Sequence, residues 1–194
     1  MTAGQAPIVN NDEGRQSRES WIIAAFETLG KEGVEQVRVE KLARKLGITK
    51  GSFYWHFTDR ADLLNEVLKY WTNDMTQTVI DHTLSVTDDP IQRIYTTTED
   101  IVSNEKSRFD PHIKAWARND PEVAKIVQRV DQLRLDFICQ LFLDTGFDKE
   151  EAESRGRLLY YYLLGEHINS VIEPMNIRLE KLHAKVDLLT ADLK

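Results

Sequence analysis

The stretch from Lys50 to Phe57 holds side chains of the kinds that proteins use to contact DNA. A lysine can pair with a phosphate or a guanine edge, serine and histidine can donate or accept hydrogen bonds, and aromatic rings can cover sugars or thymine methyl groups. Helical spacing turns Phe53 and Phe57 inward as buried anchors. The stretch therefore predicts a recognition helix, which neighbouring elements must hold at the protein surface.

A second short helix and a turn precede this stretch. The apolar residues of 39–46 recur on one helical face: Val39, Leu42, Ala43 and Leu46. Gly47 follows where the chain must turn sharply, because glycine takes positive φ without steric cost, and Thr49 is placed to cap the next helix. The whole segment predicts a helix-turn-helix, the outline of an element that enters the major groove of DNA.

Helices are also predicted on both sides of this motif. Residues 17–32 carry apolar side chains at helical spacing, which indicates a helix that needs a partner to cover it. After the motif, Asp59 is a predicted N-cap and Asp62 an acidic residue in the first turn, so a long helix is expected from about 60 to 84.

In this arrangement the chain resembles the tetracycline-repressor (TetR) family of one-component transcriptional regulators, over residues 17 to about 70. The likeness is carried by Ala24, Ala25 and Phe26 with Leu29 and Gly33, by residues 42–48 and 50–57, and by Asp59 with Leu63 and Leu64. It implies an all-α protein: an N-terminal three-helix DNA-binding head with a helix-turn-helix, then a C-terminal helical bundle for effector binding and dimerisation. The expected division is 1–16 as a flexible lead-in, 17–60 as the head and 61–194 as the bundle.

We expect the recognition helix and the starts of its neighbours to contact DNA. The predicted DNA-binding residues are Arg38, Thr49, Lys50, Gly51, Ser52, Tyr54, Trp55, His56 and Arg60. Arg38, Thr49 and Arg60 are assigned to phosphates at helix starts. The family usually has Thr or Ser where Arg38 stands, so a cation replaces a helix cap there. A basic arm within residues 1–16 that reaches DNA is a further alternative.

The distribution of charge agrees with a local DNA-binding face. Residues 38–60 hold six Lys or Arg against two Asp or Glu, whereas the whole chain has a formal net charge of −7. A solvated helix face would give the same count, so the charge alone does not decide. No segment is long and apolar enough to span a bilayer, and no signal peptide is recognisable. The single cysteine, Cys139, excludes an intrachain disulfide and agrees with a cytoplasmic protein.

Beyond residue 60 the periodicity stays helical, and turn signals divide it into helices near 90–105, 111–119, 121–144, 148–171 and 174–193. In three Asp-Pro pairs the proline suits the first helical turn and the Asp before it is expected to cap. The last two helices are predicted to form a homodimer interface, since the last has a narrow apolar seam and the one before is apolar nearly all round. The predicted interface residues are Leu158, Tyr162, Met175, Leu179, Leu182, Val186 and Leu189. The alternative is a bundle packed wholly within one chain.

Between the head and these helices, bulky and partly polar side chains suggest the region of an effector pocket. They are Trp71, Met75, Phe109, His112, Ile113, Trp116, Phe137, Phe142, Tyr161 and His167, offered as a region because most of them are expected to serve packing. No cofactor or metal is expected, and no catalytic motif is present. The favoured function is a repressor that binds a palindromic operator as a homodimer and is released by a small molecule of unknown identity. A transcriptional activator, a helical enzyme and a protein-binding adaptor remain as alternatives.

Overall fold

The computed structural model describes residues 17–104, 109–168 and 173–191, without the side chain of His167. Within these ranges the protein is all-α, as predicted, and no strand occurs. The described part of the chain holds nine α-helices: α1 Arg18–Glu32, α2 Val39–Leu46, α3 Arg60–Thr72, α4 Thr78–Val86, α5 Pro90–Ser103, α6 Asp110–Ala117, α7 Pro121–Asp144, α8 Lys149–Ile168 and α9 Met175–Thr190. The predicted lead-in, residues 1–16, lies outside the described residues.

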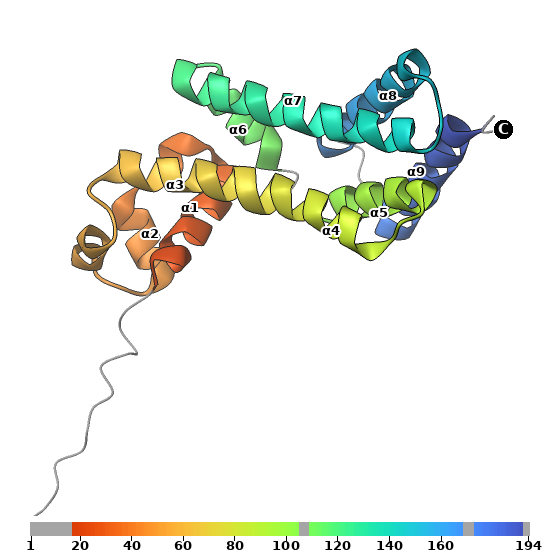
Figure 1. Ribbon diagram of the computed structural model, residues 1–194. Helices are drawn as coiled ribbons and strands as arrows, with labels where there is room; N and C mark the ends of the chain where they lie inside the picture. Colours follow the sequence, from red (N-terminus) through yellow and green to blue (C-terminus); the bar gives the residue numbers. More distant parts are fainter. Residues whose placement is uncertain (1–16, 105–108, 169–172, 192–194) are drawn as a thin grey trace, which may run out of the picture.

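Helices α1, α2 and α3 form a head at one end of the molecule (Figure 1). Helix α1 begins where the Ser17 hydroxyl accepts a hydrogen bond from the Ser20 amide at 3.2 Å, and it ends at Gly33 with φ of 87°. Trp21 and Phe26 on α1 are fully buried. The apolar core that receives them also takes side chains from α2, α3, α6 and the first half of α7. The head is therefore packed directly onto the rest of the chain.

Residues 60–86 form a long helical rod, made of α3, a π-helical turn and α4, that runs from the head across the molecule (Figure 1). Asp59 caps its start as predicted, since its side chain accepts from the Asp62 amide at 2.9 Å. The rod differs from the predicted single helix in its middle, because a π-helical turn, Asn73–Gln77, separates α3 from α4. Such turns interrupt the regular hydrogen-bond ladder of an α-helix.

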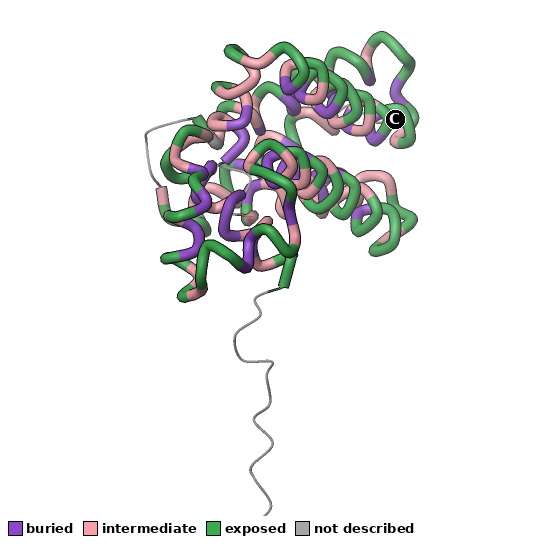
Figure 2. Tube along the Cα trace, turned by 90° about the vertical axis from the view of Figure 1, so that its left-hand side faces the viewer, coloured by how far each residue is buried: buried purple, intermediate pink, exposed green. Residues whose placement is uncertain are grey.

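A second apolar core lies among α5, the second half of α7, α8 and α9. Helix α7 is long enough to contribute Val123, Val127 and Val130 to the first core, and Ile138 and Phe142 to the second. Figure 2 shows the buried positions gathered where helices face one another, with exposed positions on the outside. No helix in the described ranges has the length and apolarity that a membrane span requires.

The apolar seam of α9 faces this second core within the same chain. Leu182 and Val186 are fully buried, while Leu179 and Leu189 pack against the core at partial exposure. For Leu182 and Val186 the prediction that they meet a second copy is wrong, because α5 and α8 already cover these side chains, while for the partly exposed Leu179 and Leu189 it stays a prediction. The periodicity identified a buried face correctly, but it carried no information about which helix would cover it.

Two of the three predicted Asp-Pro caps are confirmed. Asp89 accepts hydrogen bonds from the amides of the second and third residues after it, and Asp120 does the same at the start of α7. Asp110 does not cap, because it lies inside α6 behind Phe109 and its carboxylate points into the protein. That difference places a buried acid between the head and the second core.

Candidate nucleic-acid interface and internal cavity

The turn of the helix-turn-helix has the geometry that the sequence predicted. Gly47 takes a left-handed conformation, with φ of 70°, and the amide of Ile48 donates to the Ala43 carbonyl at 3.0 Å. These bonds satisfy carbonyl groups at the end of α2, where no further helical turn follows. The chain then turns directly into the recognition segment.

The recognition segment, Lys50–Trp55, is a 3₁₀ helix. The predicted hydroxyl cap from Thr49 is absent, and instead the Thr49 carbonyl accepts from the Ser52 amide at 3.2 Å and from the Ser52 hydroxyl at 3.0 Å. A 3₁₀ helix rises further per residue than an α-helix, so its side chains are spaced more widely along the axis. The segment is therefore longer and narrower than an α-helix with the same number of residues.

Buried aromatic rings hold the recognition segment in place. Phe53 is fully buried, and its ring centroid lies 5.2 Å from that of Trp21 in an edge-to-face contact. Phe57 is 2 % exposed and stacks on Phe53 at 5.3 Å. Both anchors were predicted from their spacing, and edge-to-face pairs of this kind add to the free energy gained by burial. They fix which face of the segment points outward.

The outward face carries five of the predicted DNA-binding residues: Thr49, Lys50, Gly51, Tyr54 and Trp55. Tyr54 is 56 % exposed and Trp55 66 % exposed, which is unusual for large aromatic side chains on one short element. Arg38 is also exposed, at the start of α2. The structure thus brings these residues to one surface region of the head, while their contacts with DNA stay a prediction.

Three other predicted residues occupy different environments. Ser52 is only 5 % exposed, so its expected exposure to DNA is wrong, because the tight 3₁₀ turn directs its hydroxyl to the backbone. Arg60 is turned back into the head and donates to the Val37 and Val34 carbonyls, both at 2.6 Å, which replaces the predicted phosphate contact. His56 is half-buried, and its Nε2 has no hydrogen-bond partner in the described part of the chain.

The lysines near this surface form ion pairs with glutamates of the head. Lys50 pairs with Glu40, and the hydrogen bond between them raises the pKa of Lys50 and lowers the pKa of Glu40. Lys45 pairs with Glu27 at 2.9 Å. Exposed pairs of this kind contribute little to stability, so a phosphate can replace the glutamate at small cost. Lys50 is thereby held charged and close to the exposed aromatic rings.

The residues predicted to line an effector pocket are spread over several environments. Trp71, Phe109 and Ile113 lie in the first core and Phe142 in the second, so these four are corrected from ligand contacts to packing. Tyr161 is 56 % exposed on the outside of α8. His112 has a buried Nδ1 without a partner among the described atoms, and Trp116 packs partly exposed against the first core. The side chain of His167 lies outside the described residues.

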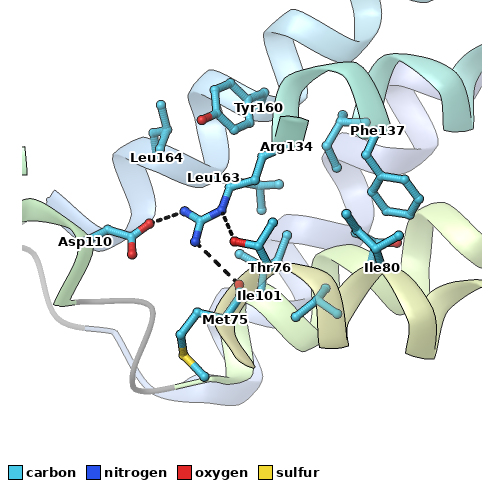
Figure 3. Close-up of a pocket in the computed structure, with 13 residues that line it drawn as sticks. Met75, Thr76, Ile80, Ile101, Asp110, Arg134, Phe137, Tyr160, Leu163 and Leu164 are labelled. Carbon is cyan, nitrogen blue, oxygen red and sulfur yellow. Dashed lines mark hydrogen bonds and ion pairs between the residues drawn. The ribbon is translucent and has the colours of Figure 1, made fainter. Parts of the chain in front are cut away.

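A cavity of about 60 Å³ lies between the two cores, lined by residues of the rod, α5, α6, α7 and α8 (Figure 3). Met75 and Phe137 line it, as predicted. Its walls are otherwise mainly apolar, with two charged groups at one end, Asp110 and Arg134. Sequence reasoning missed this ion pair, because its members are 24 residues apart on different helices. A cationic residue within the apolar pattern of α7 was the one signal that could have pointed to it.

Helix α8 carries an exposed stripe that the dimer prediction named only in part. Leu158 is 59 % exposed and Ile168 68 % exposed, and they share a helical face with Tyr161 and Gly165. Tyr162 lies half-buried against the second core, and Met175 on α9 is 38 % exposed. The apolar surface open to a partner therefore lies mainly on α8.

The fold and these surfaces define a class: an all-helical protein with a helix-turn-helix head joined to a larger helical bundle. Residues 22–67 match the sequence model of "Bacterial regulatory proteins, tetR family". The chain is 38 % identical over 56 residues to the "Uncharacterized HTH-type transcriptional regulator TtgW" of Pseudomonas putida, and 43 % identical over 51 residues to the "Tetracycline repressor protein class D" of Escherichia coli. Those matches cover 29 % and 26 % of this chain, and 42 % and 23 % of the two relatives.

The likeness in three dimensions extends over nearly the whole chain. The crystal structure of a transcriptional regulator from Rhodococcus sp. Rha1 superposes with a TM-score of 0.69 at 18 % identity, covering 90 % of this chain and 94 % of that one. At this identity the comparison shows a shared fold. The sequence match of residues 22–67 therefore confirms the predicted TetR-family likeness for the head, and the structural comparison shows that the rest of the chain shares the fold of such regulators.

Proposed function

We propose that the protein is a transcriptional repressor that binds a palindromic operator as a homodimer and is released by a small-molecule effector in the cytoplasm. The observation that carries the proposal is the exposed face of the recognition segment, where Lys50, Tyr54 and Trp55 stand on a buried aromatic base. The sequence match of the head to the TetR family supports DNA as the partner of this face.

The chemistry of this face suits a DNA groove. Lys50 supplies a charge for a phosphate or a guanine edge, and the two exposed rings supply apolar surface for sugars and thymine methyl groups. Arg38 and Thr49 lie at the starts of the two helices of the motif, where backbone amides also favour phosphate. Ser52 and Arg60 are left out of this set, since the backbone of the head already holds their side chains.

The proposed homodimer places α8 at the interface. Leu158, Tyr161 and Ile168 expose an apolar stripe, and Gly165 within it has no atom within 4 Å of where a Cβ would stand. A stripe with a small residue in it allows a second helix to approach closely, and two-fold symmetry would pair the stripe with itself. Such a dimer presents two recognition segments, as a palindrome with half-sites roughly 34–36 Å apart requires.

Release by an effector is proposed to act through linkage. A molecule that binds more tightly to a conformation in which the two heads no longer fit the half-sites must weaken DNA binding by the same factor. The cavity lies beside the rod that begins in the head, and Met75 and Thr76 of the rod's π turn line it. This contact gives the cavity a physical connection to the DNA-binding surface.

Selection from random double-stranded oligonucleotides tests the proposal. The purified protein should enrich an inverted repeat, and Lys50→Ala should weaken its binding at least several-fold in a gel-shift titration. Lys125→Ala is the matched control, because Lys125 is equally an exposed lysine in an ion pair but lies far along the chain on α7. Failure to enrich any sequence would refute DNA reading and favour the adaptor, in which the basic face binds an acidic protein.

The oligomeric state needs a test that leaves the second core intact. Removal of α9 would expose that core, so a pair of substitutions on α8 is preferable: Leu158→Glu with Tyr161→Glu should convert the dimer to a monomer in light scattering. Leu84→Glu is the control, since Leu84 is 47 % exposed on α4, away from α8. A dimeric mass for the α8 variant would contradict the assignment.

The remaining alternatives have their own discriminators. A helical enzyme would keep a catalytic activity after the DNA-binding face is disabled by Lys50→Ala, whereas the proposed repressor would lose its cellular effect. Activation and repression differ in where the operator lies relative to the promoter, so a reporter assay with the selected sequence placed at either position separates them.

A further inference from the structure

Arg134 of α7 stands at one end of the cavity with its guanidinium group inside the protein. In Figure 3 the guanidinium lies between Asp110 on one side and the apolar residues Phe137 and Ile80 on the other. The Arg134 side chain is only 17 % exposed. A buried cation at the edge of an apolar space is costly unless it is paired, so the position calls for an explanation.

The hydrogen bonds of Arg134 leave part of its capacity unused. Nε donates to the Thr76 hydroxyl at 2.9 Å, Nη1 donates to Oδ2 of Asp110, and Nη2 donates to the Met75 carbonyl at 3.4 Å. A guanidinium group has five N–H donors in a planar fork, so the bonds described account for three of them. Arg134 also lies over the Trp71 ring, with its Cζ 5.1 Å from the centroid.

Asp110 is the sole carboxylate that pairs with Arg134 in the described structure, and it also accepts a hydrogen bond from a residue of the head. Its Oδ1 accepts from the indole N–H of Trp71 at 2.7 Å. Trp71 is fully buried on α3, and Asp110 opens α6. One carboxylate therefore joins α3, α6 and α7. Because Asp110 and Arg134 both line the cavity, an anion bound there could compete with Asp110 for the Arg134 guanidinium.

We propose that the effector is an amphipathic carboxylic acid, whose carboxylate takes the place of Asp110 on Arg134 while its apolar tail fills the cavity. This inference rests on the proposed function and names the ligand class for its effector site. In Figure 3 the guanidinium lies between Asp110 and the apolar side chains, so the headgroup of a ligand whose tail fills the apolar space would face the cation rather than Asp110. A ligand ammonium group would instead be repelled by Arg134 before it reached Asp110.

The walls of the cavity suit an apolar tail. Val79, Ile80, Ile101, Ile138, Leu163 and Leu164 contribute aliphatic surface. The space of about 60 Å³ holds only a few water molecules, so the tail must displace side chains as it enters. Met75 lines the cavity from the π turn, and its unbranched side chain adapts readily to such a change.

Loss of the Arg134 pair has a direct consequence for the head. Asp110 would be left as a buried carboxylate with one neutral donor, and α6 must shift to bring it to water or to another donor. Helix α6 follows Phe109, whose ring packs so closely on Gly30 of α1 that a Cβ there would lie 2.1 Å from it. A shift of α6 is thereby passed to α1 and, through Trp71, to α3.

A matched set of probes tests the ligand class without DNA. Hexanoate, octanoate and decanoate would be titrated by calorimetry against the alcohols and amines of the same chain lengths. The best carboxylate should bind roughly 10- to 100-fold more tightly than its alcohol, the range expected for charge-assisted hydrogen bonds to a guanidinium group. Equal affinities for acid and alcohol, preference for the amine, or no binding by any acid would overturn the proposal.

Variants of the ion pair give opposite expected results. Asp110→Asn removes the competing charge and keeps an oxygen for Trp71, so it should bind the carboxylate several-fold more tightly than the natural protein. Arg134→Gln with Asp110→Asn replaces both charges together, leaves no unpaired buried ion, and should remove the preference for acid over alcohol. Circular dichroism and thermal unfolding check that both variants fold. An unchanged acid preference in the double variant would contradict the role of Arg134.

The same ligands, combined with the DNA selection, distinguish a failure of this inference from a failure of the proposed repressor function. If the acid binds through Arg134 and releases the selected DNA, both stand. If the acid binds but the protein selects no DNA, the ligand class stands and the repressor proposal fails. If DNA is selected and no acid binds, the repressor proposal stands and the carboxylate inference is overturned.

Discussion

Gly30 gives the most direct test of how tightly the head is joined to the rest of the chain. It lies in the last turn of α1, and an alanine Cβ there would stand 2.1 Å from Cγ of the buried Phe109 ring. Ordinary carbon contacts are about 3.5–4.0 Å, so the ring must move by roughly 1.5 Å in Gly30→Ala. Overpacking of this kind costs about 1–3 kcal/mol, while replacing a helical glycine by alanine returns about 0.5–1 kcal/mol. Taken at the middle of both ranges, the expected net loss of unfolding free energy is about 1 kcal/mol.

Urea unfolding followed by tryptophan fluorescence measures this loss, with all variants at one protein concentration. Asn65→Ala is the control, because Asn65 is exposed within α3 and alanine there gains helix propensity without a clash, so this variant should gain a little stability. Phe109→Leu should remove much of the clash, so the double variant with Gly30→Ala should show a favourable coupling free energy in a double-mutant cycle. A neutral or stabilising Gly30→Ala, or additive effects in the cycle, would refute the close packing of α1 on Phe109.

Three further predictions concern single side chains. Phe53→Ala should lower the unfolding free energy by about 3–5 kcal/mol because it empties a buried site, while Trp55→Ala, at a site 66 % exposed, should change it by less than about 0.5 kcal/mol; thermal unfolding compares the two. The pKa of Glu66 is lowered by its hydrogen bonds to Arg18 and then Lys69, so its stabilising effect is present above its ordinary pKa of 4.5 and is lost as pH falls through the lowered value. The destabilisation by Glu66→Gln should therefore appear in urea titrations near neutral pH and fade as the pH falls below 4.5. Tyr160→Phe removes the hydroxyl that donates to Asp131 at 3.0 Å and should cost about 0.5–1.5 kcal/mol in urea unfolding.

Features set by neighbouring residues were predictable from the sequence. The start of α3 at Asp59 and the turn at Gly47 depend on bonds within a few residues, and both are present. The inward direction of Phe53 and Phe57 followed from helical spacing, although the segment proved to be 3₁₀ rather than α. In that segment the different pitch changed the outcome for Ser52, which local spacing had placed on the outside.

Features set by distant partners were not predictable. Asp110 precedes a proline just as Asp89 and Asp120 do, yet it turns inward, because Trp71 and Arg134 lie beside it in the fold. Nothing near Asp110 in the sequence distinguishes it from the two Asp residues that cap. Likewise, the α9 seam is covered by α5 and α8 of the same chain, a fact that only the packed structure supplies.

The π turn of the rod lies beside the buried ion pair, and this position offers a route for the proposed coupling between the cavity and DNA. The Met75 carbonyl and the Thr76 hydroxyl, both in the π turn, accept hydrogen bonds from Arg134. A π turn is a local departure from the α-helical ladder, and helices bend at such points more readily than along a regular stretch. When Arg134 exchanges Asp110 for another anion, the rod is therefore perturbed at its most adaptable turn, while the α3 portion remains packed in the head. In the proposed homodimer, the direction of α3 relative to α4 is then the quantity that would couple the cavity to the spacing of the two recognition segments.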